Sequence, residues 1–296
     1  MSNTRFLAIV AAAATGVLVG AAMVSTRSLT SAAPPVTIAF LRYLIGVVML
    51  GLPVLLAHRI RFAGKDAAAI AALGVLQFAV LIVLLNIALG SLSAATCALI
   101  FSTMPLVTLC LAVGLRQERF SMARLAGVSL AVAGVAVLLQ ATLKQDGSGS
   151  SDMTAMAALI GATLIGAICS MLYRPYVQRY AALPVSALAM LAAVLFLACL
   201  CVATGQPLAP SLNAVQWGHI GFIGLASGVG YFCWLWALSQ LDASRVVAFQ
   251  ALGPITAAAI ELLLTRAMPS WTQWLSMILV IAGLRLASVT RAKRTA

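Results

Sequence analysis

Two proline-bearing stretches, one in each half of the chain, constrain the fold more than any other feature. They span 76–105 and 225–254 and align without a gap at an offset of 149 positions. The identical residues at this offset include Val80 and Val229, Leu92 and Leu241, and Pro105 and Pro254. Several identities at one offset, in similar apolar surroundings, indicate an internal repeat. Because the offset is about half of the 296 residues, the chain is predicted to be a duplicated unit.

The composition places this duplicated unit in a membrane. The chain is 63% hydrophobic and 8% charged, with a mean hydropathy of +1.10, whereas a soluble domain carries about 25% charged residues. The net charge of +12 does not indicate nucleic-acid binding, because the Lys and Arg residues fall at the ends of apolar segments. We therefore expect an all-α integral membrane protein whose partners are the bilayer and a small-molecule substrate, with no nucleic acid. No cofactor is expected, and a monomer satisfies this plan.

Ten apolar segments of roughly 20 residues are each long enough to cross a bilayer as a helix. They are 6–26, 36–57, 67–89, 94–115, 122–140, 155–173, 185–204, 216–239, 244–264 and 271–290. The six cysteines lie inside apolar runs without the spacing of metal ligands, which favours a role as small buried hydrophobes and not as a metal site.

The distribution of positive charge predicts how the segments are oriented. Thirteen Lys and Arg residues fall at the segment ends on the side of the N-terminus, and three fall at the opposite ends. The more positive side is cytoplasmic in membrane proteins, so both termini are expected inside the cell, at its inner (plasma) membrane. Each half holds an odd number of segments, so the second half must be inverted relative to the first. Inverted repeats are a recurring plan of secondary transporters, with the substrate site near the midplane.

The expected domains follow from this repeat. Residues 1–143 form the first five-helix unit and residues 155–296 the second. The linker at 144–154 is rich in Gly and Ser, which indicates flexibility, and it is expected outside the cell.

Several motifs together resemble the EamA branch of the drug/metabolite transporter superfamily over nearly the full length. They are IAFLRYLIG at 38–46, the Ala-Leu and Ser-Ala pairs at 88–95, the Pro105 segment followed by Glu118, WLWALSQLDASRV at 234–246, and LGP at 252–254. The resemblance implies ten helices around a central cavity, with the fifth and tenth at the periphery. Within this family, the chain resembles the exporters of aromatic and other amino acids most. One departure is that the 149 offset places Ala267 where the family often repeats the acid of Glu118.

The two repeated prolines are candidate hinges. Pro105 and Pro254 lie within apolar segments, where a proline frees one carbonyl and bends the helix. The functional interpretation is a pair of hinges for alternating access, and the alternative is a pair of static kinks that serve packing.

Uncharged polar and aromatic residues within the segments are the candidate substrate-binding residues. An intramembrane amide either bonds a neighbouring helix or faces a wet cavity, and an aromatic ring offers a large apolar surface to a ligand or to the core. The predicted set is Gln77, Phe78, Leu81, Asn86, Phe101, Tyr231, Trp234 and Gln250.

Two charged residues within the segments need a separate explanation. Glu261 is the acid clearly inside a span, so it is a candidate proton carrier, and the alternatives are an ion pair with Arg266 or snorkelling to the interface. Arg42 is interpreted as a structural donor or as the partner of a carboxylate.

The residues favour a transporter over an enzyme. The two histidines are far apart, and no Ser/His/Asp arrangement or carboxylate pair is present in the sequence. We expect export of aromatic and other neutral amino acids and similar small metabolites by alternating access. The alternative is an exporter of other small metabolites or cationic drugs, either proton-coupled or facilitative.

Overall fold

The structure is a computed structural model. It describes residues 3–57, 62–114, 149–241, 249–265 and 270–288, together with residue 246 and a few positions between 122 and 137. The helices of the first half are α1 (Asn3–Arg27), α2 (Pro35–Ala57), α3 (Gly64–Gly74), the π-helix η1 (Val75–Val80), α4 (Leu81–Ser91), α5 (Ala94–Phe101) and α6 (Met104–Gly114). Those of the second half are α8 (Gly149–Leu172), α9 (Arg174–Arg179), α10 (Ala182–Ala203), α11 (Ala214–Gln240), the 3₁₀ turn η2 (Phe249–Ala251), α13 (Leu252–Thr265) and α14 (Trp271–Ser288).

The described residues form a helical membrane protein. Five helical stretches among them are long and apolar enough to cross a bilayer, and further shorter helices are also apolar. Two predicted spans are built from shorter pieces: 67–89 consists of α3, η1 and α4, and 94–115 consists of α5 and α6. The segment predicted at 122–140 lies outside the described residues but for a few positions, as do Glu118 and the linker residues 144–148. The remaining linker residues, 149–154, are helical and form the start of α8, where the Gly and Ser content had predicted a flexible segment.

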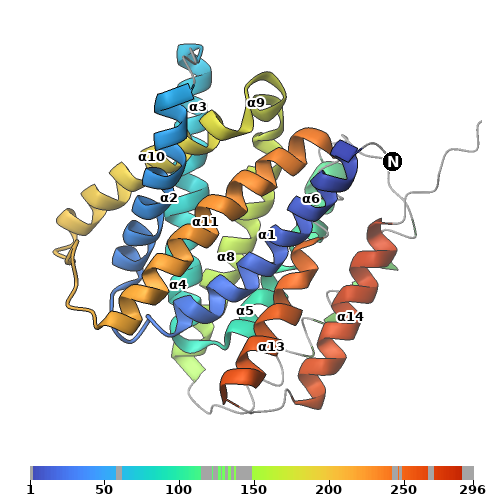
Figure 1. The fold of residues 1–296 in the computed structure, drawn as a ribbon. Helices are drawn as coiled ribbons and strands as arrows, with labels where there is room; N and C mark the ends of the chain where they lie inside the picture. The colour runs from blue at the N-terminus through green and yellow to red at the C-terminus, as the bar shows by residue number, and fades with distance from the viewer. Residues whose placement is uncertain are drawn as a thin grey trace, which may run out of the picture.

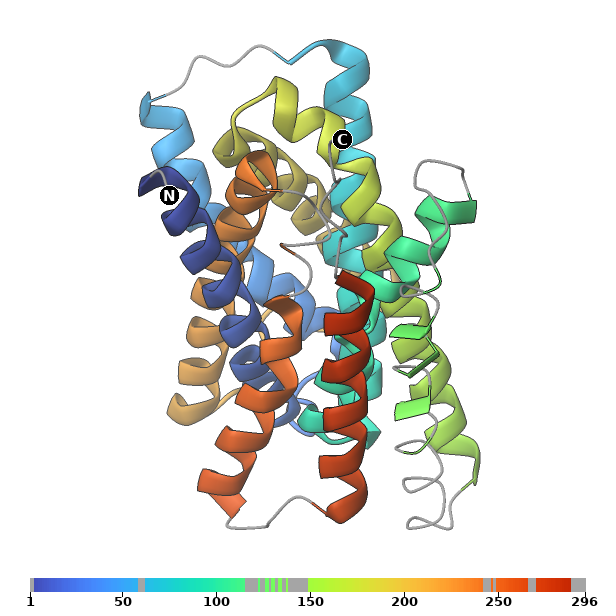
Figure 2. The ribbon, with the colours of Figure 1, turned by 90° about the vertical axis from the view of Figure 1, so that its right-hand side faces the viewer.

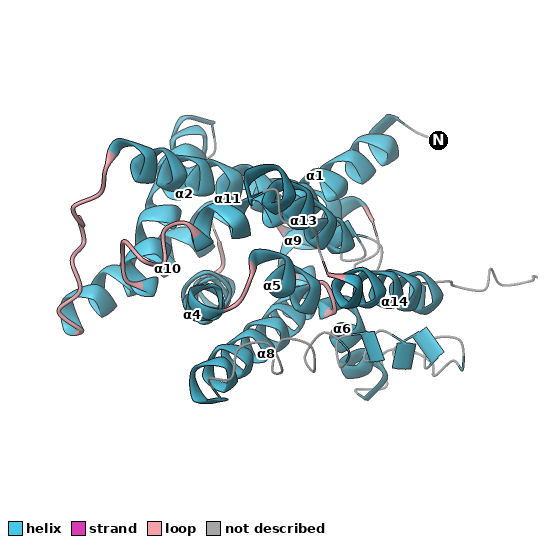
Figure 3. Ribbon diagram, turned by 90° about the horizontal axis from the view of Figure 1, so that it is seen from below, coloured by secondary structure: helices cyan, strands magenta, loops and turns pink. Residues whose placement is uncertain are grey.

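The two halves interlock instead of standing side by side. Helix α1 of the first half packs along α11 and α13 of the second (Figure 1), and α8 of the second half packs against α4 and α6 of the first (Figure 3). Helix α2 packs against both α10 and α11. Helix α14 stands at one side of the bundle (Figure 1), where it contacts α5 and α6 (Figure 3). The core therefore lies between the halves.

Helix ends carry their own sequence signals. The Ser93 side chain accepts a hydrogen bond of 3.0 Å from the N–H of Thr96 and so caps α5. Asn213 and Gln216 form a capping box at the start of α11. At the end of α10, Gly205 adopts a φ of +66°, which only glycine adopts without strain. The N–H of the next residue, Gln206, then bonds the Cys201 carbonyl at 2.8 Å and closes a Schellman motif.

Glycines allow close crossings between helices of opposite halves. A Cβ on Gly20 of α1 would overlap the carbonyl oxygen of Gly253 in α13, and one on Gly74 of α3 would overlap that of Ala189 in α10. Without a hydrophobic driving force between helices in lipid, such close contacts supply much of the van der Waals attraction. The backbones of the two halves are therefore held together at points where only glycine fits.

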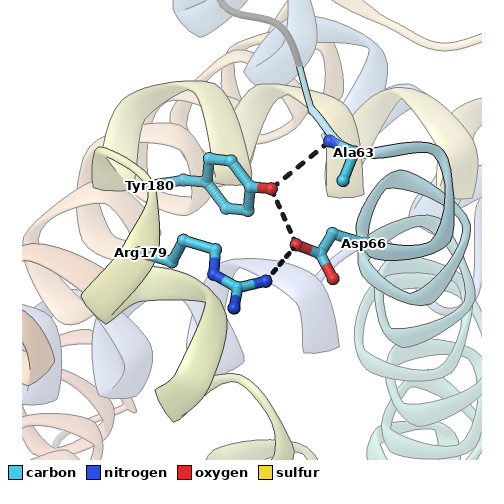
Figure 4. Close-up of polar contacts among 4 residues, drawn as sticks. All are labelled: Ala63, Asp66, Arg179 and Tyr180. Atoms are coloured by element: carbon cyan, nitrogen blue, oxygen red, sulfur yellow. Dashed lines mark hydrogen bonds and ion pairs between the residues drawn. The ribbon is translucent and has the colours of Figure 1, made fainter.

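Polar contacts join the halves at both ends of the bundle. We name the ends after an acid at each, the Asp66 end (top of Figure 1) and the Glu261 end. At the Asp66 end, the Asp66 carboxylate accepts hydrogen bonds from Arg179 Nη1 at 2.8 Å and from the Tyr180 hydroxyl at 2.7 Å (Figure 4). The Tyr180 hydroxyl also accepts a bond of 3.3 Å from the N–H of Ala63. The C-terminus of α13 and the N-terminus of α14 both lie at the Glu261 end (Figure 2).

Candidate functional site

A cavity of about 90 Å³ lies at the centre of the bundle, with walls from both halves. The first half contributes α1, α2, η1, α4, α5 and α6, and the second contributes α11 and η2. The lining residues are Thr15, Val19, Met23, Arg42, Tyr43, Gln77, Phe78, Leu81, Ile82, Leu85, Phe101, Met104, Ala226, Ser227, Gly230, Tyr231, Trp234 and Gln250. The wall is therefore mostly apolar and aromatic, with a few polar groups, which is the usual make-up of a small-molecule site.

Most of the predicted substrate-binding residues line this one cavity. They are Gln77, Phe78, Leu81, Phe101, Tyr231, Trp234 and Gln250. Asn86 does not line it. Its Nδ2 donates a hydrogen bond of 2.9 Å to the carbonyl of Pro35, so the Asn86 amide joins α4 to the start of α2.

The π-helix η1 presents Gln77 and Phe78 to the cavity. It interrupts an otherwise α-helical span between α3 and α4. An i to i+5 turn shifts the register of the side chains that follow and is frequent at functional sites. The sequence VLQFAV contains no proline or glycine that could have predicted this turn.

Three helical elements, α2, η1 and α11, bring a cluster of rings to the cavity wall. The Phe78 ring lies edge-on to Tyr231, with centroids 4.3 Å apart, and 4.9 Å from Tyr43. Tyr231 also stacks on Trp234 at 5.3 Å and approaches Tyr173, which lies between α8 and α9 behind the wall, at 6.1 Å. Such geometries are favourable for aromatic pairs. In this conformation the rings pack against one another, so a ligand ring would have to insert between them.

Four polar atoms of residues in the cavity wall have no hydrogen-bond partner among the described residues. They are Gln77 Oε1, Gln250 Oε1, Trp234 Nε1 and the Tyr231 hydroxyl oxygen, and all four are buried. A buried polar atom without a partner is unfavourable by roughly 1–3 kcal/mol, so nearly all such atoms in proteins are paired. Two acceptors, one donor and one hydroxyl in the wall of a single cavity thus indicate a site for a polar molecule.

The polar residues that sequence reasoning missed lie on α1 and α11. Thr15 Oγ1 donates to the carbonyls of Ala11, at 2.9 Å, and of Gly230, at 3.1 Å, which links the two helices. Ser227 donates to the Ile223 carbonyl at 2.6 Å and accepts a hydrogen bond from Arg42 Nε. The sequence shows Arg42 as a charged residue within an apolar segment. Its place in the cavity wall depends on packing against α11, where its partner Ser227 lies, and the segment that contains Arg42 carries no signal for that contact.

The two candidate hinge prolines lie at helix breaks beside the cavity. Helix α5 ends before Ser102, and Pro105 lies in the first turn of α6. The hydroxyls of Ser102 and Thr103 donate to the carbonyls of Leu99 at 2.7 Å and Ile100 at 2.6 Å, which satisfies acceptors that the break frees. Pro254 lies in the first turn of α13, just after η2. Broken helices at a central site are typical of secondary transporters.

Glu261 lies away from the central cavity. Its Oε1 accepts a hydrogen bond of 2.9 Å from the N–H of Ala94, the first residue of α5. The proton-carrier role stays a prediction, and the described contact is one that stabilises a helix N-terminus. Among the described residues, no group of three or more His, Cys, Asp or Glu side chains could hold a metal ion.

A second, wider hollow of about 500 Å³ opens at the Asp66 end. The loop after α9 and the end of α11 line it, including Tyr180, Trp236 and Ser239. None of the described residues that line this hollow also lines the central cavity. The wall between the two includes the turn of α11 that carries Trp234 and Trp236.

An interlocked pair of helical halves around a central cavity is the plan of a multi-pass membrane transporter, and comparison with known proteins gives its family. The model of the EamA-like transporter family matches residues 6–140 and again 153–289, so the chain belongs to this family and holds two copies of its domain. It is a transporter and not an enzyme, with a small molecule as its substrate.

Individual relatives are distant. The chain is 25% identical over 222 residues to an uncharacterized transporter of Archaeoglobus fulgidus, covering 75% of this chain and 76% of that one. It is 26% identical over 224 residues to a probable terminal-alkyne amino-acid exporter of Streptantibioticus cattleyicolor, covering 75% and 73%. A solved crystal structure shares the fold with a TM-score of 0.72 and 20% identity, covering 97% of each chain.

Proposed function

We propose that the chain exports neutral amino acids, aromatic ones among them, and similar small metabolites across the inner membrane by alternating access. The observation that carries this proposal is the central cavity, in which an aromatic wall faces the unpaired polar atoms of Gln77, Gln250 and Trp234. An amino acid offers both an apolar side chain and hydrogen-bonding groups to such a wall. The name of the Streptantibioticus relative, an amino-acid exporter, supports the same substrate class.

The size of the cavity supports a mechanism in which the helices move. Pockets that hold drug-sized ligands measure about 300–1,000 Å³, whereas this cavity measures about 90 Å³. A bulky amino acid therefore enters only when the halves separate. We place the moving parts at the breaks beside Pro105 and Pro254, because the helix is already interrupted there. With both termini inside the cell, the Asp66 end and its wider hollow face the cytoplasm.

The test is transport by the purified full-length protein in liposomes. Liposomes loaded with unlabelled phenylalanine, leucine or alanine are mixed with the same labelled amino acid outside, with and without a pH gradient. We expect labelled amino acid to accumulate by counterflow in liposomes that contain the protein and not in protein-free ones. The substrate assignment is wrong if no amino acid of the panel moves in either direction, and a panel of cationic drugs in the same liposomes then tests the alternative substrate class.

A further inference from the structure

Arg42 places a positive charge in the wall of the central cavity. It lies in α2 and is 8% exposed, and its neighbours in the wall include Tyr43 and Ser227. Arginine remains protonated in proteins, so this charge is permanent. A charge within a membrane span is unfavourable unless another group compensates it, and such residues mark ligand pathways more often than structural sites.

The described contacts of Arg42 are all with neutral groups. Its Nε donates to the Ser227 hydroxyl, and its guanidinium carbon lies 5.7 Å from the centroid of the Tyr43 ring. No described side chain or carbonyl accepts a hydrogen bond from its two terminal amino groups. The acids whose side chains the structure describes are engaged elsewhere, Asp66 with Arg179 at one end of the bundle and Glu261 with Ala94 at the other.

We propose that Arg42 binds the carboxylate of the transported molecule. This inference rests on the proposed function and names the chemical group that the central cavity selects. With Nε directed to Ser227, the remaining edge of the guanidinium offers two parallel donors, which match the two oxygens of a carboxylate. The Ser227 hydroxyl in turn donates to the Ile223 carbonyl at 2.6 Å, so this α11 hydroxyl is itself oriented and fixes one edge of the Arg42 guanidinium from α2.

The other unpaired atoms of the wall complete the site for an amino acid. Gln77 Oε1 and Gln250 Oε1 are acceptors, as an ammonium group requires, and the rings around Phe78 receive the side chain. A zwitterion thus finds a partner for each of its groups. A cationic drug without a carboxylate would leave Arg42 uncompensated and would add a like charge to the cavity, which disfavours it by repulsion.

Ligands that differ only in the carboxylate test the proposal with the wild-type protein. Phenylalanine, its carboxamide phenylalaninamide, and 3-phenylpropionate, which keeps the carboxylate but lacks the ammonium group, are compared as competitors of phenylalanine counterflow. They are also compared as stabilisers of the purified protein against heat. We expect the apparent affinity for phenylalaninamide to be at least about tenfold lower than that for phenylalanine in both assays, because the amide leaves the charged hydrogen bonds of Arg42 unmade. We expect 3-phenylpropionate, which keeps the carboxylate, to retain binding.

Variants then assign the effect to Arg42. Arg42→Gln should remove the preference for phenylalanine over phenylalaninamide, and Arg42→Lys, which keeps the charge but not the planar fork, should retain part of it. Arg5→Gln is the matched control, because it removes an exposed arginine at the start of α1 and should leave the preference unchanged. If Arg42→Gln does not fold, the wild-type ligand pair still decides the question.

Different results would overturn the role of Arg42 and the proposed export of amino acids. Equal competition by phenylalanine and phenylalaninamide, with transport intact, overturns the role of Arg42 and leaves amino-acid export standing. A preference for phenylalanine that survives in Arg42→Gln overturns it as well. If no amino acid is transported, the proposed function fails, and the stabilisation assay still reports on carboxylate binding. In the stabilisation assay, the role of Arg42 is overturned if neither phenylalanine nor 3-phenylpropionate raises the melting temperature of the protein above its value with phenylalaninamide.

Discussion

The carboxylate of Glu261 in α13 accepts a hydrogen bond from the backbone N–H of Ala94, the first residue of α5, at 2.9 Å. The first N–H groups of a helix have no partner within the helix, and a negative charge is favourable beside them. Within the same turn, Ser93 bonds the N–H of Thr96. The one acid that the sequence places clearly inside a span thus binds the helix start of the opposite half.

This contact leads to a prediction that separates structure from proton transport. Glu261→Gln keeps an oxygen acceptor for the Ala94 N–H, so we expect a nearly unchanged melting temperature and an unchanged effect of a pH gradient on transport. Glu261→Ala removes the acceptor and should destabilise the protein by about 0.5–2 kcal/mol, as loss of a helix cap does. Thermal unfolding and liposome transport measure the two effects. Loss of the pH-gradient effect in a stable Glu261→Gln protein would instead support a proton carrier.

The contact between Asp66 and Arg179 predicts how the Asp66 end opens. The Arg179 side chain is 68% exposed and that of Asp66 is 17% exposed, and exposed ion pairs contribute only about 0–1 kcal/mol. Asp66→Asn should therefore change the melting temperature little but favour separation of the halves at this end. In a background without native cysteines, Cys introduced at Ser239, in the adjoining hollow, should react faster with a water-soluble thiol reagent when Asp66→Asn is added.

The control for this experiment is Arg174→Gln, which removes an exposed charge from the same end of the bundle. It should leave the reactivity of the introduced cysteine unchanged. Equal acceleration by both variants would show that the loss of surface charge, and not the Asp66 contact, governs access. High salt should accelerate the reaction of the unmodified background, because it screens an exposed pair.

Close packing at Gly74 gives a prediction about stability. A Cβ at this position would overlap the Ala189 carbonyl of α10, and backbone cannot move aside as a flexible side chain does. Gly74→Ala should destabilise the protein by about 1–3 kcal/mol, the usual effect of overpacking. Gly218→Ala is the matched control, since that α11 glycine has nothing within 4 Å, and alanine should there be neutral or stabilise the helix by up to about 1 kcal/mol. Equal changes of melting temperature in the two variants would contradict the close contact between α3 and α10.

The sequence predicted the elements of this fold better than their local distortions. The apolar segments and the repeated prolines follow from hydrophobicity and from the internal repeat, which are properties of the chain itself. The π-turn that carries Gln77 and the break before Pro105 depend on neighbouring helices, and only the break has a sequence signal. Helix α1 packs against the second half and α8, the first helix of the second half, packs against the first half, as expected for two copies of one unit.

The candidate site was predictable in residue type more than in geometry. Gln77 and Asn86 look alike as intramembrane amides, yet nine residues separate them, which places them roughly on opposite faces of an α-helix. Only Gln77 lines the cavity. The partnership of Arg42 with Ser227 joins residues 185 positions apart, and no periodicity within one segment indicates a contact of that kind.

The pair of amides provides the sharpest test of the site. The side-chain oxygens of Gln77 and Asn86 both lack a partner among the described residues, but only Gln77 lines the cavity, and Asn86 Nδ2 bonds the Pro35 carbonyl at 2.9 Å. Gln77→Ala should therefore lower apparent affinity for a transported amino acid by about 2- to 10-fold, since one hydrogen bond contributes about 0.5–1.5 kcal/mol, with no loss of thermal stability. Asn86→Ala should do the reverse, because it removes the hydrogen bond between α4 and the start of α2, and so lower the melting temperature at unchanged affinity. Concentration-dependent counterflow and thermal unfolding of both variants measure this. A Gln77→Ala protein that unfolds early but binds normally would place Gln77 among the packing residues and remove it from the site.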